Sequence, residues 1–363
     1  MLKHRSIVPL ISLYAIGWLI YKIKRDFYKT STPLFPIQKL TSENLKEDGL
    51  DGICHICSVD SAVVKVRITW RTMAQRSKKH HFVPKVLQQR FIAEPKRIWY
   101  SELENDNRFS PPQLRNIQKT FRIRDYYTVL VGGDQSDIVE TDFYGRIDDY
   151  LGKMLPNVLD ALDRGVVPTF SGHSLDSVRK VVMEMAKRTP EFVKKHDDIA
   201  MGREIVETSL ATLSDTTRSN EQSKLHCALE NPSQLRMYGR NVRVQATINR
   251  SERIEEALGE FSVRWAVSET HHSFILSSLM AYRIGNGGSN GLSNPNMEIW
   301  MPIAPKASLV LIRDPENKIP LIVKERPHHI RQVNEFAMKN SRQIASHSKE
   351  LMESLTGKRA KLV

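Results

Sequence analysis

The hydrophobic pattern of this chain changes once, and that change restricts its fold more than any single motif does. Residues 141–162, 174–196 and 199–213 carry apolar side chains at the spacing of one helix face, and Pro190 is expected to bend or divide the second segment. After about residue 239 the pattern is that of short strands. Helices first and strands later favour an α+β fold over a regularly alternating sheet, with a helical N-terminal half and a strand-rich C-terminal half in one domain.

The expected elements follow from this pattern. Strands are predicted at residues 97–100, 126–131, 241–248, 262–267, 273–278, 308–312 and 320–323. Residues 85–92 are predicted to form a short amphipathic helix, residues 329–355 a long final helix, and residues 214–232 a polar connection. The domain is therefore expected to run from about residue 78 to residue 355.

The charge balance favours polyanionic partners. The chain carries a formal net charge of +13 and has an isoelectric point near 9.6. Nucleic acid and anionic membrane faces attract such a protein, and a merely solubilising surface explains the charge equally well. The three cysteines fit a reducing compartment, and Cys54 and Cys57 have the spacing of only half a zinc site.

The first 72 residues are set apart from the predicted domain. Residues 7–21 are an apolar run of 15 residues, shorter than the roughly 20 that span a bilayer, so the segment 6–23 is a candidate membrane anchor or a buried helix. The positive cluster Lys22, Lys24 and Arg25 predicts a cytoplasmic main body, tethered to the inner face of the membrane if the run inserts. A competing hypothesis starts translation at Met73 and leaves residues 1–72 as an extension that is not made in vivo.

Two histidines stand in front of the short helix expected at residues 85–92. Residues 78–84 read KKHHFVP, so two imidazoles and two ammonium groups precede Pro84. Proline favours the first helical position, where backbone N–H groups have no partner within the helix. Imidazoles beside such groups suit an anion or a metal ion.

The order of several short motifs resembles a bacterial family of domains of unknown function, family 4238, which opens with a His-His-x-Val-Pro signature. Glu140 and Asp148 stand where that family carries two acids, and the strand motif at residues 273–278 lacks the Asp that follows it in other members. The resemblance implies no established activity. The other matching segments are residues 80–84, 98–100, 188–190 and 301–305.

One hypothesis for these residues is metal-assisted hydrolysis of a phosphodiester in nucleic acid, a nuclease-like activity. Imidazole can bind a metal or accept a proton from water, and arginine can hold a phosphate through two N–H groups. The hypothesis requires one cleft lined by all the residues involved. The candidate catalytic residues are His80, His81, Glu140 and Arg188, and the candidate ligands of a divalent metal are His81, Glu140 and Asp148.

The same residues also allow a purely structural interpretation. Adjacent histidines point to opposite faces of a strand, so two of them rarely bind one ion. Glu140, at the start of its helix, can complement the helix dipole, and Arg188 can pair with Glu184 or Glu191 on neighbouring turns. A buried ionic network of this kind fixes a fold without any catalysis.

The alternative function is a nucleic-acid-binding protein without enzymatic activity. Mixtures of arginine and aromatic side chains can hold phosphates and stack on bases, although a solvated face explains them as well. No glycine-rich phosphate loop of the Walker type and no Gly-x-Ser-x-Gly elbow occur, which disfavours ATP hydrolysis and α/β-hydrolase chemistry. The candidate contacts, the last three of them around Tyr238, are Lys78, Lys79, Arg236, Arg240 and Arg243.

Overall fold

The computed structural model describes residues 79–131, 134–170, 172–194, 196–212, 219–249, 251–288 and 291–359, and all of them belong to one compact unit. The candidate anchor 6–23, Met73, Lys78 and the Cys54–Cys57 pair lie outside these ranges. None of the helices described has the length and apolar character needed to traverse a bilayer. Helices and sheets are both present, so the predicted α+β class is confirmed.

A five-stranded sheet forms the centre of the fold. Its order is β12 (Ile322–Lys324), β7 (Ser262–Val267), β11 (Ala307–Ile312), β10 (Glu298–Ala304) and β9 (Tyr282–Ile284). All neighbours are antiparallel except β12 and β7, which run parallel. The strands predicted at residues 262–267, 308–312 and 320–323 are confirmed. Strand β10 was expected only in part, through the resemblance of residues 301–305 to a strand motif of the family.

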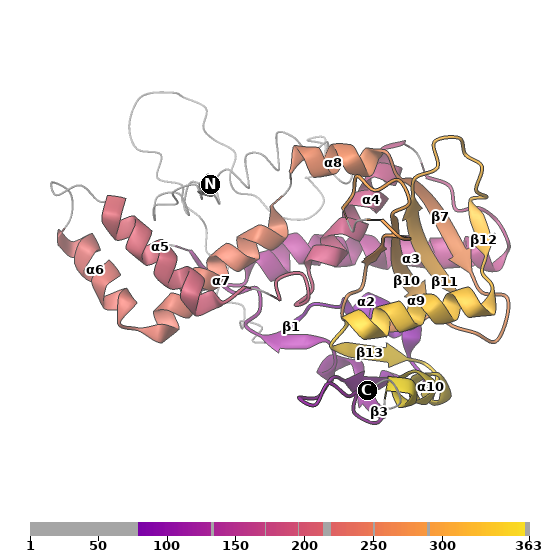
Figure 1. Ribbon diagram of the computed structural model, residues 1–363, viewed down its shortest axis with the longest axis horizontal. Helices are drawn as coiled ribbons and strands as arrows, with labels where there is room; N and C mark the ends of the chain where they lie inside the picture. The colour runs from indigo at the N-terminus through magenta and orange to yellow at the C-terminus, as the bar shows by residue number, and fades with distance from the viewer. Residues whose placement is uncertain are drawn as a thin grey trace, which may run out of the picture. The chain divides into compact units, whose positions relative to one another are not determined.

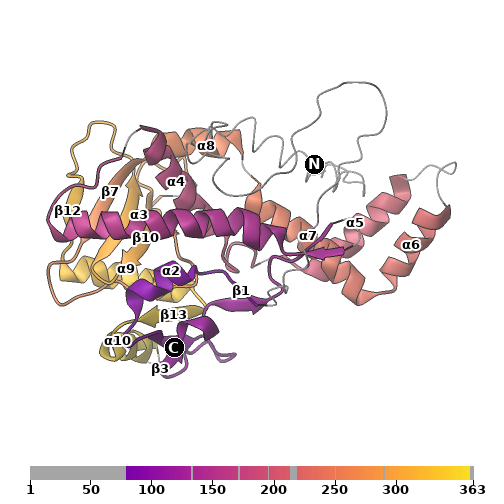
Figure 2. The same cartoon turned by 180° about the vertical axis from the view of Figure 1, so that it is seen from behind.

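Helices cover both faces of this sheet. Met301 of β10 belongs to a hydrophobic core that includes Leu151 of α3 (Gly145–Asp163). The preceding residue, Trp300, belongs to a second core that includes Ile330 of α9 (Pro327–Asn340). This division follows from the alternation of side chains along a strand. Helix α9 lies in front of the sheet in Figure 1, and α3 lies in front of it in the reverse view of Figure 2.

A second sheet has the order β3 (Gln113–Asn116), β2 (Arg97–Glu102), β13 (Gln343–Ser346) and β8 (Leu276–Ser277). The single helix predicted at residues 329–355 is wrong, because β13 separates α9 from α10 (Lys349–Arg359). Ile344 and Ala345 of β13 are fully buried, and that burial outweighs helical propensity here. The hydroxyl of Ser348 accepts a hydrogen bond from the N–H of Leu351 at 3.1 Å and starts the new helix.

The segment predicted as a strand at residues 273–278 pairs over only two residues. The buried side chain of Asn334, on α9, accepts a hydrogen bond from the N–H of Ile275 at 3.1 Å and donates one to the carbonyl of Ser273 at 2.8 Å. One amide therefore satisfies backbone groups that a neighbouring strand would otherwise satisfy.

Short strands precede the helices, so the first half of the domain is not simply helical. Strand β1 (Lys79–His81) pairs with β4 (Arg122–Arg124), and β5 (Val129–Val131) pairs with β6 (Asp134–Ser136). Between β1 and β2 lie α2 (Lys85–Gln88) and a 3₁₀ turn, Gln89–Phe91. Pro84 occupies the N-cap position rather than the predicted first helical position.

The helices then follow in sequence. A π-helical segment (Val139–Tyr144) leads into α3, and α4 (Gly172–Lys187) ends before Pro190, as its ring requires. Helix α5 (Asp198–Thr212) matches the prediction, but α6 (Ser219–Leu229) occupies the segment predicted as a connection. Helix α8 (Glu252–Gly259) precedes β7.

The predicted strand at residues 241–248 is wrong, because this segment is the end of α7 (Pro232–Ile248). The side chain of Asn231 caps the helix by accepting hydrogen bonds from the N–H groups of Ser233 and Gln234, and Pro232 follows it at the start. The alternation of Val242, Val244 and Ala246 was misleading.

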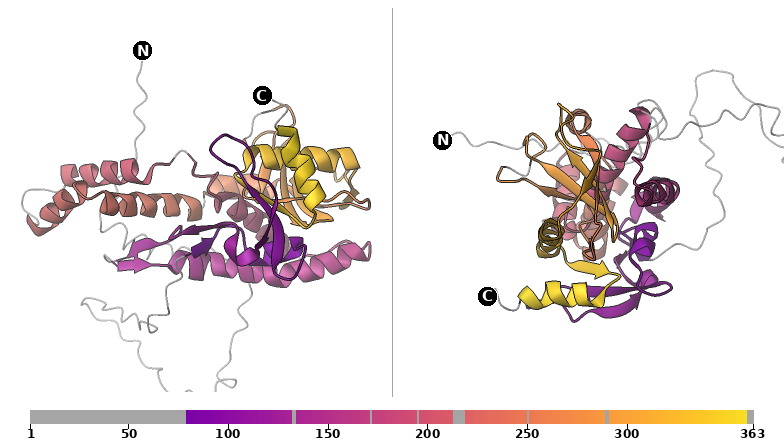
Figure 3. Two further views of the ribbon diagram at one scale, coloured as in Figure 1. Left: turned by 90° about the horizontal axis from the view of Figure 1, so that it is seen from below. Right: turned by 90° about the vertical axis from the view of Figure 1, so that its right-hand side faces the viewer.

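Helices α5 and α7 cross at two glycines and lie side by side (Figure 3, left). A Cβ added at Gly202 would lie 1.9 Å from the carbonyl oxygen of Leu235, and one at Gly239 would lie 1.7 Å from that of Asp198. Both neighbours are backbone atoms that cannot move aside, so these positions require glycine. The contact fixes the rotation of α7 about its axis and therefore the face on which its arginines lie.

Candidate functional site

Arg188 gathers three separate segments around one buried guanidinium. It follows the last turn of α4, is fully buried, and binds both carboxylate oxygens of Asp148 on α3. Its Nη2 also lies 3.9 Å from Oε2 of Glu140 in the π-helical segment. The guanidinium carbon stands 4.5 Å from the ring centre of Tyr144. Glu140, Asp148 and Arg188, three of the predicted site residues, therefore lie together.

His81 joins this network through its backbone rather than its imidazole. Its carbonyl oxygen accepts a hydrogen bond from Nη2 of Arg188 at 2.8 Å. The predicted pairs of Arg188 with Glu184 or Glu191 do not form, because Glu184 pairs with Lys187 and Arg188 turns toward Asp148.

His80 points to the opposite face of β1 and is fully buried. Its Nδ1 accepts a hydrogen bond from the N–H of Tyr127 at 2.8 Å, which leaves Nε2 facing Asp137 at 3.5 Å. Its ring stacks on Tyr127 at 5.8 Å. The side chains of the two adjacent histidines therefore lie in two different environments, because successive side chains of a strand point to opposite faces.

Burial shifts two pKa values in this network. It raises the pKa of Glu140 to about 7, although the charge of Arg188 opposes the shift. Burial, with the charges of Lys85 and Arg122, lowers the pKa of His81 to about 4. The Nε2 atom of His81 is buried without a hydrogen-bond partner among the described residues. At neutral pH, Glu140 is therefore partly protonated and His81 is neutral.

The predicted metal ligands are not assembled as a ligand set. Within the described ranges, no three side chains of the types His, Cys, Asp and Glu are placed to hold a metal ion. Asp148 and Glu140 instead face Arg188, and His81 contributes only backbone atoms to that contact. The geometry fits the structural interpretation of this network better than a metal centre.

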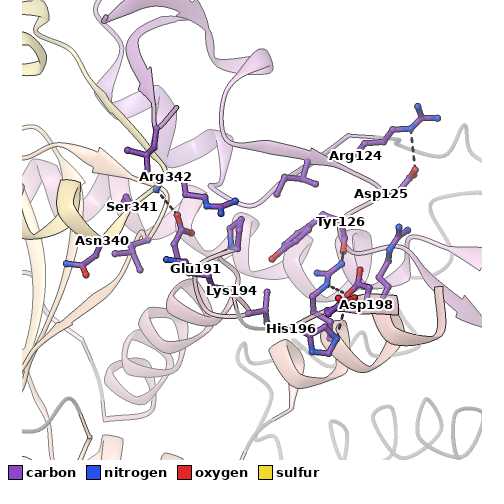
Figure 4. A pocket seen from close by; sticks show the side chains of 18 of the residues that line it. Arg124, Asp125, Tyr126, Glu191, Lys194, His196, Asp198, Asn340, Ser341 and Arg342 are labelled. Carbon is purple, nitrogen blue, oxygen red and sulfur yellow. Dashed lines mark hydrogen bonds and ion pairs between the residues drawn. The ribbon is translucent and has the colours of Figure 1, made fainter. Parts of the chain in front are cut away.

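A basic cavity of about 950 Å³ lies beside the network and collects side chains from several elements (Figure 4). Arg236, Arg240 and Arg243 reach it from α7, where their spacing places them on one helix face. The three arginines predicted as nucleic-acid contacts therefore line one cavity. Four further cationic residues line the cavity, namely Arg124, Lys194, Lys339 and Arg342.

The acidic residues of the basic cavity already have partners. Asp198 accepts a hydrogen bond from Nε of Arg243 at 3.0 Å, and Asp197 caps α5 by accepting the N–H groups of Ile199 and Ala200. Asp125 lies 3.4 Å from Arg124. Oε1 of Glu191 accepts hydrogen bonds from the backbone N–H of Arg342 at 3.0 Å and from the hydroxyl of Ser278, while its Oε2 is buried without a hydrogen-bond partner among the described residues.

Four cations of the basic cavity remain without such partners. Within the described ranges, the side chains of Lys194, Arg236, Arg240 and Arg342 make no hydrogen bond or ion pair. Burial and the neighbouring charge of Arg243 lower the pKa of Arg240, while the charges of Asp198 and Asp125 oppose the shift. Among the described residues, these four cations therefore form no hydrogen bond or ion pair with the acids of the cavity.

Tyr126 completes the wall of the basic cavity. Its ring lies 4.4 Å beneath the guanidinium carbon of Arg243, and Figure 4 shows its side chain directed toward the side on which Glu191 and Lys194 lie. Its buried hydroxyl has no hydrogen-bond partner in the described part of the chain. Burial raises the pKa of Tyr126 to about 12, so this hydroxyl stays protonated and can donate.

Some of these residues carried no signal in the sequence. Lys194, Arg342 and Tyr126 are far apart along the chain, and only folding brings them to one cavity. The helical spacing of Arg236, Arg240 and Arg243 was readable, and the Asn231-Pro232 start would have placed it on a helix. Tyr238, by contrast, packs on a small core of α5–α7, and Lys79 is exposed on β1.

Comparison with known proteins identifies the family but not an activity. The model of DUF4238, described as a protein of unknown function, matches residues 79–350, and the chain belongs to this family. No curated protein and no solved structure matches the chain.

Proposed function

We propose that this protein binds nucleic acid through the basic cavity. The observation that supports the proposal is the unpaired charge of Lys194, Arg236, Arg240 and Arg342 around one concavity whose acids already have partners. Phosphate groups are the commonest polyanionic partners of clustered arginines, which bind them through two N–H groups at once. The net charge of +13 adds a long-range attraction for the negatively charged phosphates.

The salt dependence of binding tests this proposal. Each phosphate contact to a single strand contributes about 0.7 to the slope of log affinity against log salt. The double variant Arg236→Ala/Arg240→Ala should therefore lose affinity for a labelled oligonucleotide and reduce that slope by about 1.4. Fluorescence anisotropy of the full chain at several salt concentrations measures both quantities.

A variant with the same charge loss elsewhere provides the control. Arg283 and Arg326 are exposed and lie outside the basic cavity. Arg283→Ala/Arg326→Ala should keep most of the affinity and nearly the whole slope. If both double variants weaken binding equally, the overall charge and not the cavity is responsible, and the proposal is wrong.

A second candidate function is hydrolysis of a phosphodiester at Glu140. The observation in its favour is a carboxyl group with a pKa near 7 beside a buried arginine, since such a group exchanges protons at neutral pH. Cleavage of a labelled oligonucleotide by the wild type, lost in Glu140→Gln and kept in Asp149→Asn, supports it. Loss of cleavage on adding a chelator supports the metal-assisted form. A wild type without cleavage excludes both.

A further inference from the structure

A histidine is among the residues that line the basic cavity. Nε2 of His196 lies 3.1 Å from the carbonyl oxygen of Gly239. A carbonyl oxygen can only accept a hydrogen bond, so Nε2 carries the hydrogen and Nδ1 carries the lone pair. The side chain is 14% exposed, and among the described residues its Nδ1 has no hydrogen-bond partner. The ring can therefore accept a proton from a molecule bound in the cavity.

The fold holds this imidazole in place. The N–H of His196 donates a hydrogen bond to the carbonyl of Val193 at 2.9 Å. Its other partner, Gly239, is the glycine of α7 that touches the backbone of Asp198 where α5 and α7 cross. Nε2 of His196 also lies 3.6 Å from Oδ1 of Asp198, and Figure 4 shows the two side chains next to each other. A carboxylate on this side of the ring favours the positive charge that an imidazole gains when it accepts a proton.

Two arginines lie at the same end of the cavity. Asp198, beside the imidazole, accepts a hydrogen bond from Nε of Arg243 at 3.0 Å. Burial lowers the pKa of Arg240, and the charges of Arg243 and Asp198 act on that pKa in opposite directions, so both groups are close to Arg240. Guanidinium groups in such a place can bind a phosphate and stabilise the negative charge that develops when its phosphorus is attacked.

A base beside cations can catalyse one reaction of nucleic acid without a nucleophile from the protein. In RNA the 2′-hydroxyl lies next to the phosphorus of its own nucleotide, so the substrate itself holds the nucleophile near its target. The protein has only to remove the proton of that hydroxyl and to stabilise the charge on the phosphate. DNA has no 2′-hydroxyl, so the same side chains cannot cleave it in this way.

We infer that the basic cavity cleaves RNA, with His196 as the general base. Nδ1 takes the proton of the 2′-hydroxyl, O2′ forms a bond to the phosphorus, and the bond from the phosphorus to O5′ breaks. The 5′-oxygen takes a proton from a water molecule, and the hydroxide left behind takes the proton from the imidazolium. The products are a 2′,3′-cyclic phosphate and a 5′-hydroxyl end. The inference rests on the proposed function and names RNA as its substrate.

The experiment compares two probes with four forms of the full chain. The probes are a labelled RNA oligonucleotide and a DNA oligonucleotide of the same sequence, each with and without a chelator. The forms are the wild type, His196→Gln, His226→Gln and Arg236→Ala/Arg240→Ala. Glutamine at residue 196 keeps an amide N–H that can reach the carbonyl of Gly239 but has no basic nitrogen. His226 is the matched control, because it is exposed on α6 and lies outside the cavity.

The wild type should cleave the RNA, leave 2′,3′-cyclic phosphate ends, and do so equally well with the chelator. The DNA should be bound without being cleaved. His196→Gln should lower the rate of RNA cleavage about 10²- to 10⁴-fold, the usual contribution of a general base, and leave the affinity for RNA unchanged. His226→Gln should change neither the rate nor the affinity.

Four results would overturn the inference. They are a wild type that does not cleave RNA, cleavage of DNA at the same rate, loss of cleavage with the chelator, and equal rates for His196→Gln and His226→Gln. Should any of these occur while Arg236→Ala/Arg240→Ala still weakens binding, only the inference fails and the proposed function stands. If the two arginines also have no effect on binding, both fail.

Discussion

Tyr127 and Arg188 are joined by a hydrogen bond of 2.6 Å, from the phenol hydroxyl to the main-chain carbonyl. The same tyrosine donates its N–H to Nδ1 of His80 and stacks on that imidazole. The His-His-x-Val-Pro segment and the Arg-Thr-Pro segment, which lie about a hundred residues apart, are therefore linked by one buried side chain.

Removing this hydroxyl should destabilise the fold without unfolding it. Tyr127→Phe leaves the carbonyl of Arg188 without its buried donor, which costs about 1–3 kcal/mol. Urea denaturation should show a lower midpoint with an unchanged slope. Tyr282→Phe removes a buried hydroxyl that has no hydrogen-bond partner among the described residues and is the comparison. Equal losses of unfolding free energy in the two variants would show that the hydrogen bond to Arg188 does not contribute to stability.

Replacing Arg188 should lower the free energy of unfolding more than Tyr127→Phe does. Arg188→Met leaves Asp148 and Glu140 without their cation, and breaking a buried ion pair in this way costs about 3–5 kcal/mol. The lower end is expected, because the side chain of Asp148 is 34% exposed and water can partly replace the arginine. The double variant Arg188→Met/Asp148→Leu should recover part of the stability. A double variant less stable than the sum of the single ones contradicts this account.

The unusual pKa of His81 should make the fold sensitive to acid. Its folded-state pKa of about 4 is below its ordinary value of 6.5, so the unfolded chain binds the proton more readily. Stability is therefore complete above pH 6.5 and is lost as the pH falls from 6.5 toward 4. The free energy of unfolding of His81→Gln should fall less than that of the wild type between pH 7 and pH 5. Parallel pH profiles for the two proteins would refute the assignment to His81.

Glu140 should act in the opposite direction. Its folded-state pKa of about 7 exceeds its ordinary value of 4.5, so the folded chain retains the proton more readily. Its contribution is complete below pH 4.5 and is lost as the pH rises through 7. Glu140→Gln should therefore gain stability relative to the wild type between pH 5 and pH 8. Thermal unfolding at these two pH values measures the difference, and a constant difference would contradict the prediction.

The glycine contact between α5 and α7 should be intolerant of any side chain. Gly239→Ala places a Cβ 1.7 Å from a backbone oxygen, so the helices must separate, at a cost of about 1–3 kcal/mol. Gly259→Ala is the control, because nothing lies within 4 Å of a Cβ there. Hydrogen exchange should be faster in α5 and α7 of Gly239→Ala alone. Unchanged exchange in both variants would show that the helices are not in contact.

Sequence periodicity was sufficient for elements whose pattern is long or strongly alternating. The helical spacing at residues 141–162 and the strands at residues 97–100 and 262–267 were read correctly, because burial on one face determines them. Residues 241–248 were misread, because three alternating apolar residues also fit a helix, and only the cap at Asn231 decides between the two. The local pattern at residues 341–346 carried no information about the distant strands that bury it.

The candidate site was predictable in part for a similar reason. Charged residues such as Glu140, Asp148 and Arg188 that lie within a largely apolar context must find partners, so their convergence could be expected. The sequence could not show that His81 would contribute its backbone, because every residue has the same backbone groups. The sequence also could not show which acids of the basic cavity have partners, because a hydrogen bond or ion pair depends on side-chain positions to within about an ångström.

The position of β13 has a consequence for how this protein is made. Residues 343–346 stand between β2 and β8, so the strand that completes the second sheet leaves the ribosome long after β2. Until then β2 has an open edge where β13 will pair, and its partner is about 240 residues away. This sheet can therefore close only after residues 343–346 have been made. A ribosome that stalls before residue 343 would release a product whose unpaired β2 edge promotes aggregation.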